Sequence, residues 1–188
     1  MNKAVRKILL KKTKVVVKMK EVTKSNTKEK NLALTAVVAA LYVAISLVLA
    51  PLSFGAVQFR LAEMFNHLAA FNKRYIYSLI IGCFIVNLFS PLGIVDVIVG
   101  TLGTAIGAVS TYYFTRKVTK NLWKYVIASL CQIPGVFLVT AELVVLTKIP
   151  FWLTLGSVFV GEMLSMAVGA VIIQLLSQRI DFVNGKRK

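Results

Sequence analysis

The hydrophobic positions of this chain fall into six runs separated by short polar or turn-forming segments. The runs cover residues 31–49, 61–71, 75–89, 97–114, 122–146 and 151–176. A helix of about 20 residues crosses a hydrocarbon core of about 30 Å, so the longer runs predict transmembrane helices. The run 61–71 has only 11 residues between Arg60 and Lys73. We therefore expect a short helix there, enclosed by the rest of the protein.

Proline and glycine residues interrupt these runs at positions that predict local geometry. The sequence Ser90-Pro91-Leu92-Gly93 predicts a turn after the third run, and Pro134-Gly135 predicts a kink near the middle of the fifth. Carbonyl groups freed at such a kink can line a cavity. In the fourth run three glycines recur at i, i+3 and i+7, which predicts close approach of a neighbouring backbone, at Gly100, Gly103 and Gly107.

Composition and charge indicate how these runs are arranged across the membrane. The 188 residues are 57% hydrophobic with a mean hydropathy of +0.77, which indicates one integral membrane domain. Of the 23 Lys and Arg residues, 21 fall in segments that six crossings place on one side, leaving only Arg60 and Lys148 outside. We therefore predict an all-α integral membrane protein of the cell membrane, with six transmembrane helices and both termini cytoplasmic.

The predicted domain 31–180 is flanked by two basic segments. Residues 1–30 form an N-terminal extension with 11 Lys and Arg, and residues 181–188 form a basic tail. The extension is too long to be a signal peptide and lacks its cleavage pattern. Such a segment more often meets anionic lipid than nucleic acid, so we predict no nucleic-acid partner.

Several classes of chemistry are excluded. The chain has one histidine, two isolated cysteines and no GxxxxGK[ST] motif. We therefore predict no metal site, no cofactor and no ATPase activity of its own.

The ionisable residues inside the predicted membrane region are candidates for function. Insertion of such a side chain at membrane depth costs about 2.5 to 3.5 kcal/mol, so these groups usually face a bundle interior and mark a site. In an α-helix, Arg60, Glu63 and His67 share one stripe of a face. This stripe predicts one wall of a cavity.

Three further carboxylates belong to the same predicted cavity. Asp96 begins the fourth helix at its outer end and Glu142 lies near the outer end of the fifth. Glu162 lies about 16 Å along the sixth helix, at about 1.5 Å per residue. Four carboxylates against one arginine predict a ligand that is rich in N–H groups or positively charged.

Each candidate also has a purely structural interpretation. In this interpretation, Arg60 and Glu63 would form only an internal ion pair, and His67 would be a hydrogen-bonded packing residue. Asp96 would then serve only to cap its helix. Asn87 and Gln132 either bond neighbouring helices or belong to the site. Four aromatic residues near the outer end stack on a flat ring or anchor at the interface: Phe59, Phe65, Phe151 and Trp152.

The first run carries a small residue at every fourth position. Ala36, Ala40 and Ala44 make a flat ridge that allows another helix to approach closely. The ridge serves either packing within this chain or docking of a partner protein.

The segments FGAVQFRLAEMFNHLAAFN and GCFIVNLFSPLGIVDVIVGTLGT, within residues 54–104, resemble the QueT family. Members of that family are substrate-binding membrane subunits, or S components, of energy-coupling factor (ECF) transporters. The similarity in layout extends over residues 31–180 and does not include the basic extension.

The resemblance implies capture of queuosine precursors, which are 7-deazaguanine bases, from outside the cell. It also implies two kinds of partner, a transmembrane coupling protein and a pair of ATP-binding cassette ATPases. The alanine ridge on the first helix of S components docks the coupling protein, and this carries over to Ala36, Ala40 and Ala44.

The function expected is therefore substrate capture, with the site at Arg60, Glu63, His67, Asn87, Asp96, Glu142 and Glu162. Two other classes remain open. One is a stand-alone proton-coupled carrier of a small nitrogen-rich solute that uses Glu142 or Glu162. The other is a membrane enzyme that uses Glu63 and His67 as a pair, although the chain lacks a second histidine and a nucleophile motif.

Overall fold

The computed structural model describes residues 27–53 and 59–187. Its elements are a first helix Thr27–Val48, α2 (Ala50–Ser53), η1 (Leu61–Ala70), α3 (Arg74–Asn87), α4 (Ile94–Thr115), α5 (Asn121–Cys131), α6 (Ile133–Thr147), α7 (Phe151–Ser177), β1 (Ile180–Asp181) and β2 (Lys186–Arg187). The chain divides into two compact units, residues 1–34 and 35–188, and the helical bundle discussed below is the second.

Four helices are long and apolar enough to cross a membrane: Thr27–Val48, Ile94–Thr115, Asn121–Thr147 and Phe151–Ser177. A shorter apolar helix, α3, and the short element η1 complete the six runs that the sequence predicted. The protein is thus a multi-pass membrane protein. Most of the predicted extension, residues 1–26, lies outside the described residues.

The predicted interruptions occur where the sequence placed them. Gly93 ends the turn with a φ of 74°, and its amide donates to the Ser90 carbonyl. The Asn121–Thr147 span is broken at Gln132, two residues before Pro134, into α5 and α6. The segment between the first two runs begins as helix, because Ala50–Ser53 forms α2, and residues 54–58 lie outside the described residues.

Element η1 differs from the predicted α-helix, because its ten residues form a 3₁₀ helix. A 3₁₀ helix rises about 2.0 Å per residue instead of about 1.5 Å, so ten residues reach about 20 Å instead of about 15 Å. The short segment thereby covers more of the membrane depth. The change of period also rearranges its faces, since residues three apart now lie directly above one another.

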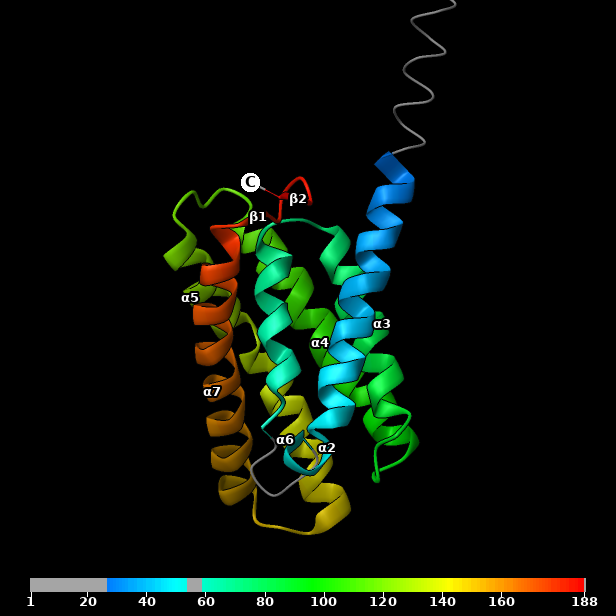
Figure 1. Ribbon diagram of the computed structural model, residues 1–188. Coiled ribbons are helices and arrows are strands. Elements are labelled where there is room, and N and C mark those ends of the chain that lie inside the picture. Colours follow the sequence, from blue (N-terminus) through cyan, green and yellow to red (C-terminus); the bar gives the residue numbers. More distant parts are fainter. Residues whose placement is uncertain (1–26, 54–58, 188) are drawn as a thin grey trace, which may run out of the picture. The chain divides into compact units, whose positions relative to one another are not determined.

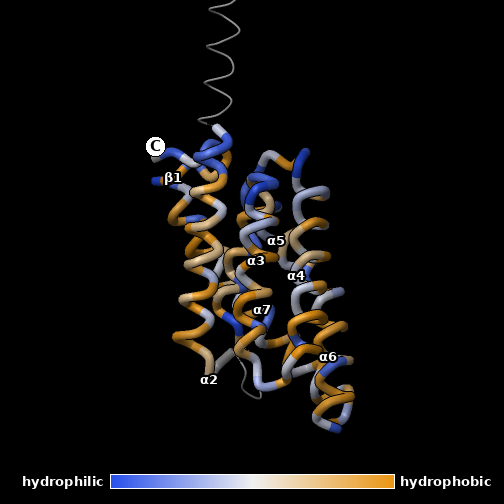
Figure 2. Tube along the Cα trace, turned by 90° about the vertical axis from the view of Figure 1, so that its right-hand side faces the viewer, coloured by the Kyte–Doolittle hydropathy of each residue, from blue (hydrophilic) through white to orange (hydrophobic). Residues whose placement is uncertain are grey.

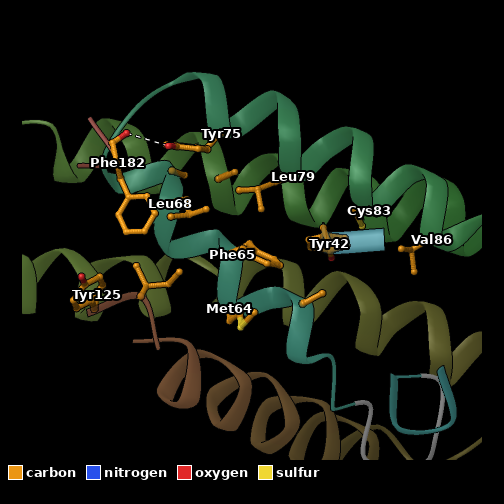
Figure 3. Packing of buried hydrophobic residues seen from close by; sticks show 14 residues of the cluster. Tyr42, Met64, Phe65, Leu68, Tyr75, Leu79, Cys83, Val86, Tyr125 and Phe182 are labelled. Carbon is orange, nitrogen blue, oxygen red and sulfur yellow. Dashed lines mark hydrogen bonds between the residues drawn. The ribbon is translucent and has the colours of Figure 1, made fainter. Parts of the chain in front are cut away.

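The core of the bundle is built around η1. Nine of its ten residues are buried, and it contacts α3, α4, α5 and α7. Phe65 and Leu68 of η1 pack with Leu79 and Cys83 of α3 and with Tyr42 of the first helix (Figure 3). The expectation of a protein-enclosed short helix is confirmed.

Glycines set the spacing of the helices, as the fourth run predicted. A Cβ atom on Gly103 of α4 would lie 3.2 Å from the Cα atom of Gly135 in α6, so the two backbones are in contact there. Gly107 faces the side chain of Gln132 and Gly100 faces that of Asn87. Small residues thus allow α4 to approach α6 and α3 closely.

Figure 1 shows the helices of the bundle side by side, with their connections gathered at two ends. Hydrophobic residues cover the lengths of the helices, and hydrophilic residues gather at the end that carries the C-terminus (Figure 2). Nine described basic residues of this unit belong to the connections and the tail at that end: Lys73, Arg74, Arg116, Lys117, Lys120, Lys124, Arg179, Lys186 and Arg187. Arg60 and Lys148 belong to the opposite end.

The C-terminal tail forms a small hairpin, which the all-α prediction did not include. Strands β1 and β2 pair antiparallel, with Ile180 opposite Arg187. Phe182, in the turn between them, is buried against Phe71, with ring centroids 5.6 Å apart. The hairpin is thereby fixed to the junction between η1 and α3.

Candidate ligand-binding pocket

A pocket lined by both ionisable and aliphatic side chains lies inside the bundle, between η1, α4, α6 and α7. It contains about 430 Å³ of empty space, part of it open to the outside. The residues that line it are Arg60, Glu63, Gly100, Gly103, Thr104, Gln132, Gly135, Val136, Val139, Val158 and Glu162. Three of the seven predicted site residues are among them.

Both carboxylate oxygens of Glu63 are held by neighbouring side chains. The Tyr42 hydroxyl donates to Oε1 at 2.7 Å, and the Asn66 side-chain amide donates to Oε2 at 2.5 Å. Glu63 is only 5% exposed, so these donors take the place of water around the carboxylate. The 3₁₀ period accounts for the second bond, because it places Asn66 directly above Glu63.

Arg60 pairs with Asp96 instead of Glu63. Its guanidinium nitrogen Nη2 lies 3.5 Å from Asp96 Oδ1, and Asp96 is fully buried in the first turn of α4. No side-chain hydrogen bond caps this helix, so the predicted cap is present only as a favourable position in the helix dipole. The alternative interpretation, an ion pair of Arg60 with Glu63, is therefore wrong, and the ion pair joins two residues that are 36 positions apart in the sequence.

Asp96 and Asn87 lie directly behind the pocket wall at Gly100. A Cβ atom on Gly100 would lie 3.2 Å from Asp96 Oδ1 and would overlap the side-chain nitrogen of Asn87. That nitrogen donates to the Asp96 carbonyl at 3.0 Å. Neither residue lines the pocket itself, and both support the part of α4 that does.

The two remaining carboxylates belong to α6 and α7. Glu162 lines the pocket and interacts electrostatically with Glu63 and Arg60. Glu142 is 5% exposed, and neither of its oxygens has a hydrogen-bond partner among the described residues. It interacts electrostatically with Asp96 and Arg60. The structure thus gathers all four predicted carboxylates around Arg60.

His67 turns away from this group, and the predicted stripe is wrong. In a 3₁₀ helix, Arg60, Glu63 and Asn66 share an edge, and His67 lies about 120° from it. Its Nε2 is 2.9 Å from the Met166 carbonyl of α7, and its ring packs edge-on against Tyr125. His67 is not among the residues that line the pocket.

The faces of the pocket are aliphatic. Val136, Val139 and Val158 line it, and no aromatic side chain does so among the described residues. Phe65 packs near Tyr42, and Phe151 packs against Trp152, which is 79% exposed. Stacking of a ligand on the four predicted aromatic residues is therefore not supported.

Sequence reasoning missed two polar residues at the site, Tyr42 and Thr104. Thr104 lines the pocket and donates to the Cys83 sulfur at 3.2 Å. Tyr42 reaches Glu63 from the inner face of the first helix. A signal for Tyr42 exists, because Ala39, Tyr42 and Ser46 form a buried stripe at i, i+3 and i+7.

An apolar helical bundle around a pocket lined by carboxylates, an arginine and valines defines a multi-pass membrane protein with a candidate small-molecule site. The profile of the family described as QueT transporter matches residues 32–178. A curated relative, "Queuosine precursor transporter QueT" of Lactococcus lactis subsp. cremoris (strain MG1363), is 36% identical over 158 residues, which cover 78% of this chain and 91% of the relative. No solved structure gives a significant match.

The chain belongs to the QueT transporter family. The resemblance that residues 54–104 indicated is confirmed over most of the chain. Because this family consists of transporters, the protein is a transport protein and not an enzyme.

Proposed function

We propose that this protein is the substrate-capture subunit, or S component, of an ECF transporter for queuosine precursors. It binds a 7-deazaguanine base in the pocket between η1, α4, α6 and α7, which opens outward. The basic end of the bundle and both termini face the cytoplasm, in agreement with the positive-inside rule. The observation that carries this proposal is the placement of Glu63, Glu162 and Arg60 around a pocket with valine walls.

The chemistry of the pocket supports this ligand class. A deazaguanine presents an amidine-like N–H edge that suits a carboxylate, and a carbonyl that suits Arg60 or an amide such as Gln132. Val136, Val139 and Val158 can cover the faces of its flat ring, and this contact removes apolar surface from water. Glu162 is the best candidate for the N–H edge, because it lines the pocket and both oxygens of Glu63 already accept hydrogen bonds from Tyr42 and Asn66. Asp96, Asn87 and Glu142 support the site from behind, and His67 is a more distant member.

The first helix supports the proposed assembly with partners. Ala36, Ala40 and Ala44 are all exposed, whereas Ala39, Tyr42 and Ser46 on the other face are buried. The ridge is therefore not used for packing among the described residues. We propose that it docks the transmembrane coupling protein, which connects this subunit to two ABC-type ATPases.

A stand-alone proton-coupled carrier is the second candidate, and Glu142 favours it. A buried carboxylate without a hydrogen-bond partner among the described residues is a group that can take up a proton. Uptake by vesicles that contain this chain alone, driven by a proton gradient, distinguishes the carrier from the ATPase-dependent subunit.

Ligand binding by the purified protein tests the proposed site. Thermal shift and titration compare the free, 7-cyano and 7-aminomethyl forms of 7-deazaguanine with guanine and common water-soluble vitamins. Glu162→Gln removes a charged acceptor, so we expect affinity for the bound deazaguanine to fall at least about tenfold.

The matched control is Glu29→Gln, the same chemical change at an exposed position of the first helix. It should leave the affinity unchanged. Absence of saturable binding by every deazaguanine would contradict the proposed substrate class. Equal affinity in wild type and Glu162→Gln would remove Glu162 from the site.

A further inference from the structure

Tyr42 connects the ligand pocket with the first helix, which carries the alanine ridge. The proposed function uses these two features separately. Its side chain is 2% exposed and lies between η1 and α3, close to Phe65 and Cys83 (Figure 3). The ring is in contact with α3 at Gly82, where a Cβ atom would lie 3.0 Å from three Tyr42 atoms. The ring of Phe65 is 6.5 Å away, centroid to centroid. The position of the tyrosine ring is therefore fixed by packing.

From this position the hydroxyl holds the carboxylate of Glu63. It donates to Oε1 at 2.7 Å. The terminal torsion of a glutamate has a broad energy minimum, so packing alone does not define the plane of its carboxylate. Donors on both oxygens, Tyr42 and Asn66, define that plane. A carboxylate has about four lone-pair sites, so it retains acceptor capacity for a ligand after these two bonds form.

The opposite face of the same helix carries the exposed alanine ridge. A helix behaves as a rigid element over a few turns. A partner protein that displaces the alanine ridge therefore also displaces Tyr42. Any displacement of the first helix from η1 lengthens the bond from Tyr42 to Glu63. The orientation of a pocket carboxylate then depends on where the first helix sits.

We propose that Tyr42 is a positioning residue of the ligand site. It orients Glu63 for the ligand and makes ligand affinity depend on the packing of the first helix against η1 and α3. This inference rests on the proposed function, because it assumes that the pocket around Glu63 binds the ligand.

A double-mutant cycle in the purified full-length protein tests the inference, with the 7-deazaguanine that wild type binds most tightly as the probe. Tyr42→Phe keeps the ring and removes the donor, so we expect affinity to fall about tenfold. In a Glu63→Met background the same change should alter affinity less than about twofold, since no acceptor is left at position 63 for the hydroxyl to orient. A purely structural loss would appear equally in both backgrounds.

Gly82→Ala provides a second, independent displacement of the tyrosine. The added Cβ pushes on the ring from α3, so affinity should again fall with Glu63 present and change little in the Glu63→Met background. This variant keeps the test decisive if Tyr42→Phe folds poorly. Thermal unfolding of each variant confirms that folded protein is compared.

The control is Tyr75→Phe, which removes a buried tyrosine hydroxyl that donates to the Phe182 carbonyl, away from the pocket. Its affinity should equal that of wild type. Unchanged affinity in Tyr42→Phe, or equal losses in both backgrounds, overturns the inference alone. Failure of the wild type to bind any deazaguanine overturns the proposed function and this inference with it.

Discussion

Gly169 shows how a single residue decides how closely two elements pack. A Cβ atom at this position of α7 would lie 2.5 Å from the Met64 Cβ and 2.6 Å from the Met64 Cα, and 3.3 Å from the His67 ring. Met64 and His67 are three residues apart and share one edge of η1. The missing side chain of Gly169 thus allows η1 to lie directly against α7, where His67 meets the Met166 carbonyl.

Gly169→Ala should therefore destabilise the protein. The new methyl group meets the Met64 backbone, which has no room to move, and we expect a loss of about 1–3 kcal/mol in the free energy of unfolding. Gly156→Ala, on the same helix, is the control, because nothing lies within 4 Å of its Cβ position. Thermal melting in detergent should show a lower midpoint for Gly169→Ala only. A midpoint equal to that of Gly156→Ala would contradict the close contact.

At the scale of elements, the C-terminal hairpin is attached to the bundle through Arg74. The guanidinium of this buried residue donates to the Phe182 carbonyl at 2.7 Å and to the Val183 carbonyl at 2.9 Å. The Asn72 amide also donates to the Val183 carbonyl, at 3.1 Å. A tail with a basic composition thus acquires a defined fold, because a buried arginine satisfies carbonyls that the two short strands leave unpaired.

Replacement of Arg74 by methionine should release the hairpin. The change leaves these carbonyls without their charged donor, at a cost of about 1–3 kcal/mol. Limited proteolysis should then cleave the chain between residues 180 and 187 faster than in wild type. Lys73→Met removes a neighbouring exposed charge and should not alter the cleavage rate. If both variants are cleaved alike, Arg74 does not hold the hairpin.

At the scale of the whole molecule, the bundle separates the pocket from the exposed alanine ridge. Glu63, Glu162 and Arg60 face inward, and Ala36, Ala40 and Ala44 face outward. Under the proposed function, ligand capture and energised uptake use different surfaces, and we expect a substitution to affect one without the other.

Ala40→Leu should separate the two activities. A larger side chain in the middle of the ridge prevents close helix approach, so uptake by cells that contain the ATPase partners should fall at least about tenfold. Ligand affinity of the purified protein should stay at the wild-type value, because Ala40 does not line the pocket. Ala167→Leu, at an exposed position of α7, is the control for added bulk. Normal uptake by Ala40→Leu would exclude the ridge as the docking surface.

The sequence by itself determined the membrane class, the six runs, the turn at Gly93, the break near Pro134 and the close contacts of the α4 glycines. These features follow from local properties, because the thickness of the hydrocarbon core sets the length of each run. A glycine or proline changes the backbone geometry or the closeness of packing at its own position. The sequence also named the four carboxylates and Arg60 that the structure gathers together, since each charge stands out in an apolar run.

Only the tertiary structure decided how these groups pair. The bonds of Arg60 with Asp96 and of Tyr42 with Glu63 join residues 36 and 21 positions apart, and no local pattern records such contacts. The same holds for η1, whose composition favours an ordinary α-helix. Its 3₁₀ form, which turns His67 toward α7 and places Asn66 on Glu63, exists where four other helices enclose the segment. A difference of 0.6 residues per turn is too small for composition to specify, and packing on every side decides it.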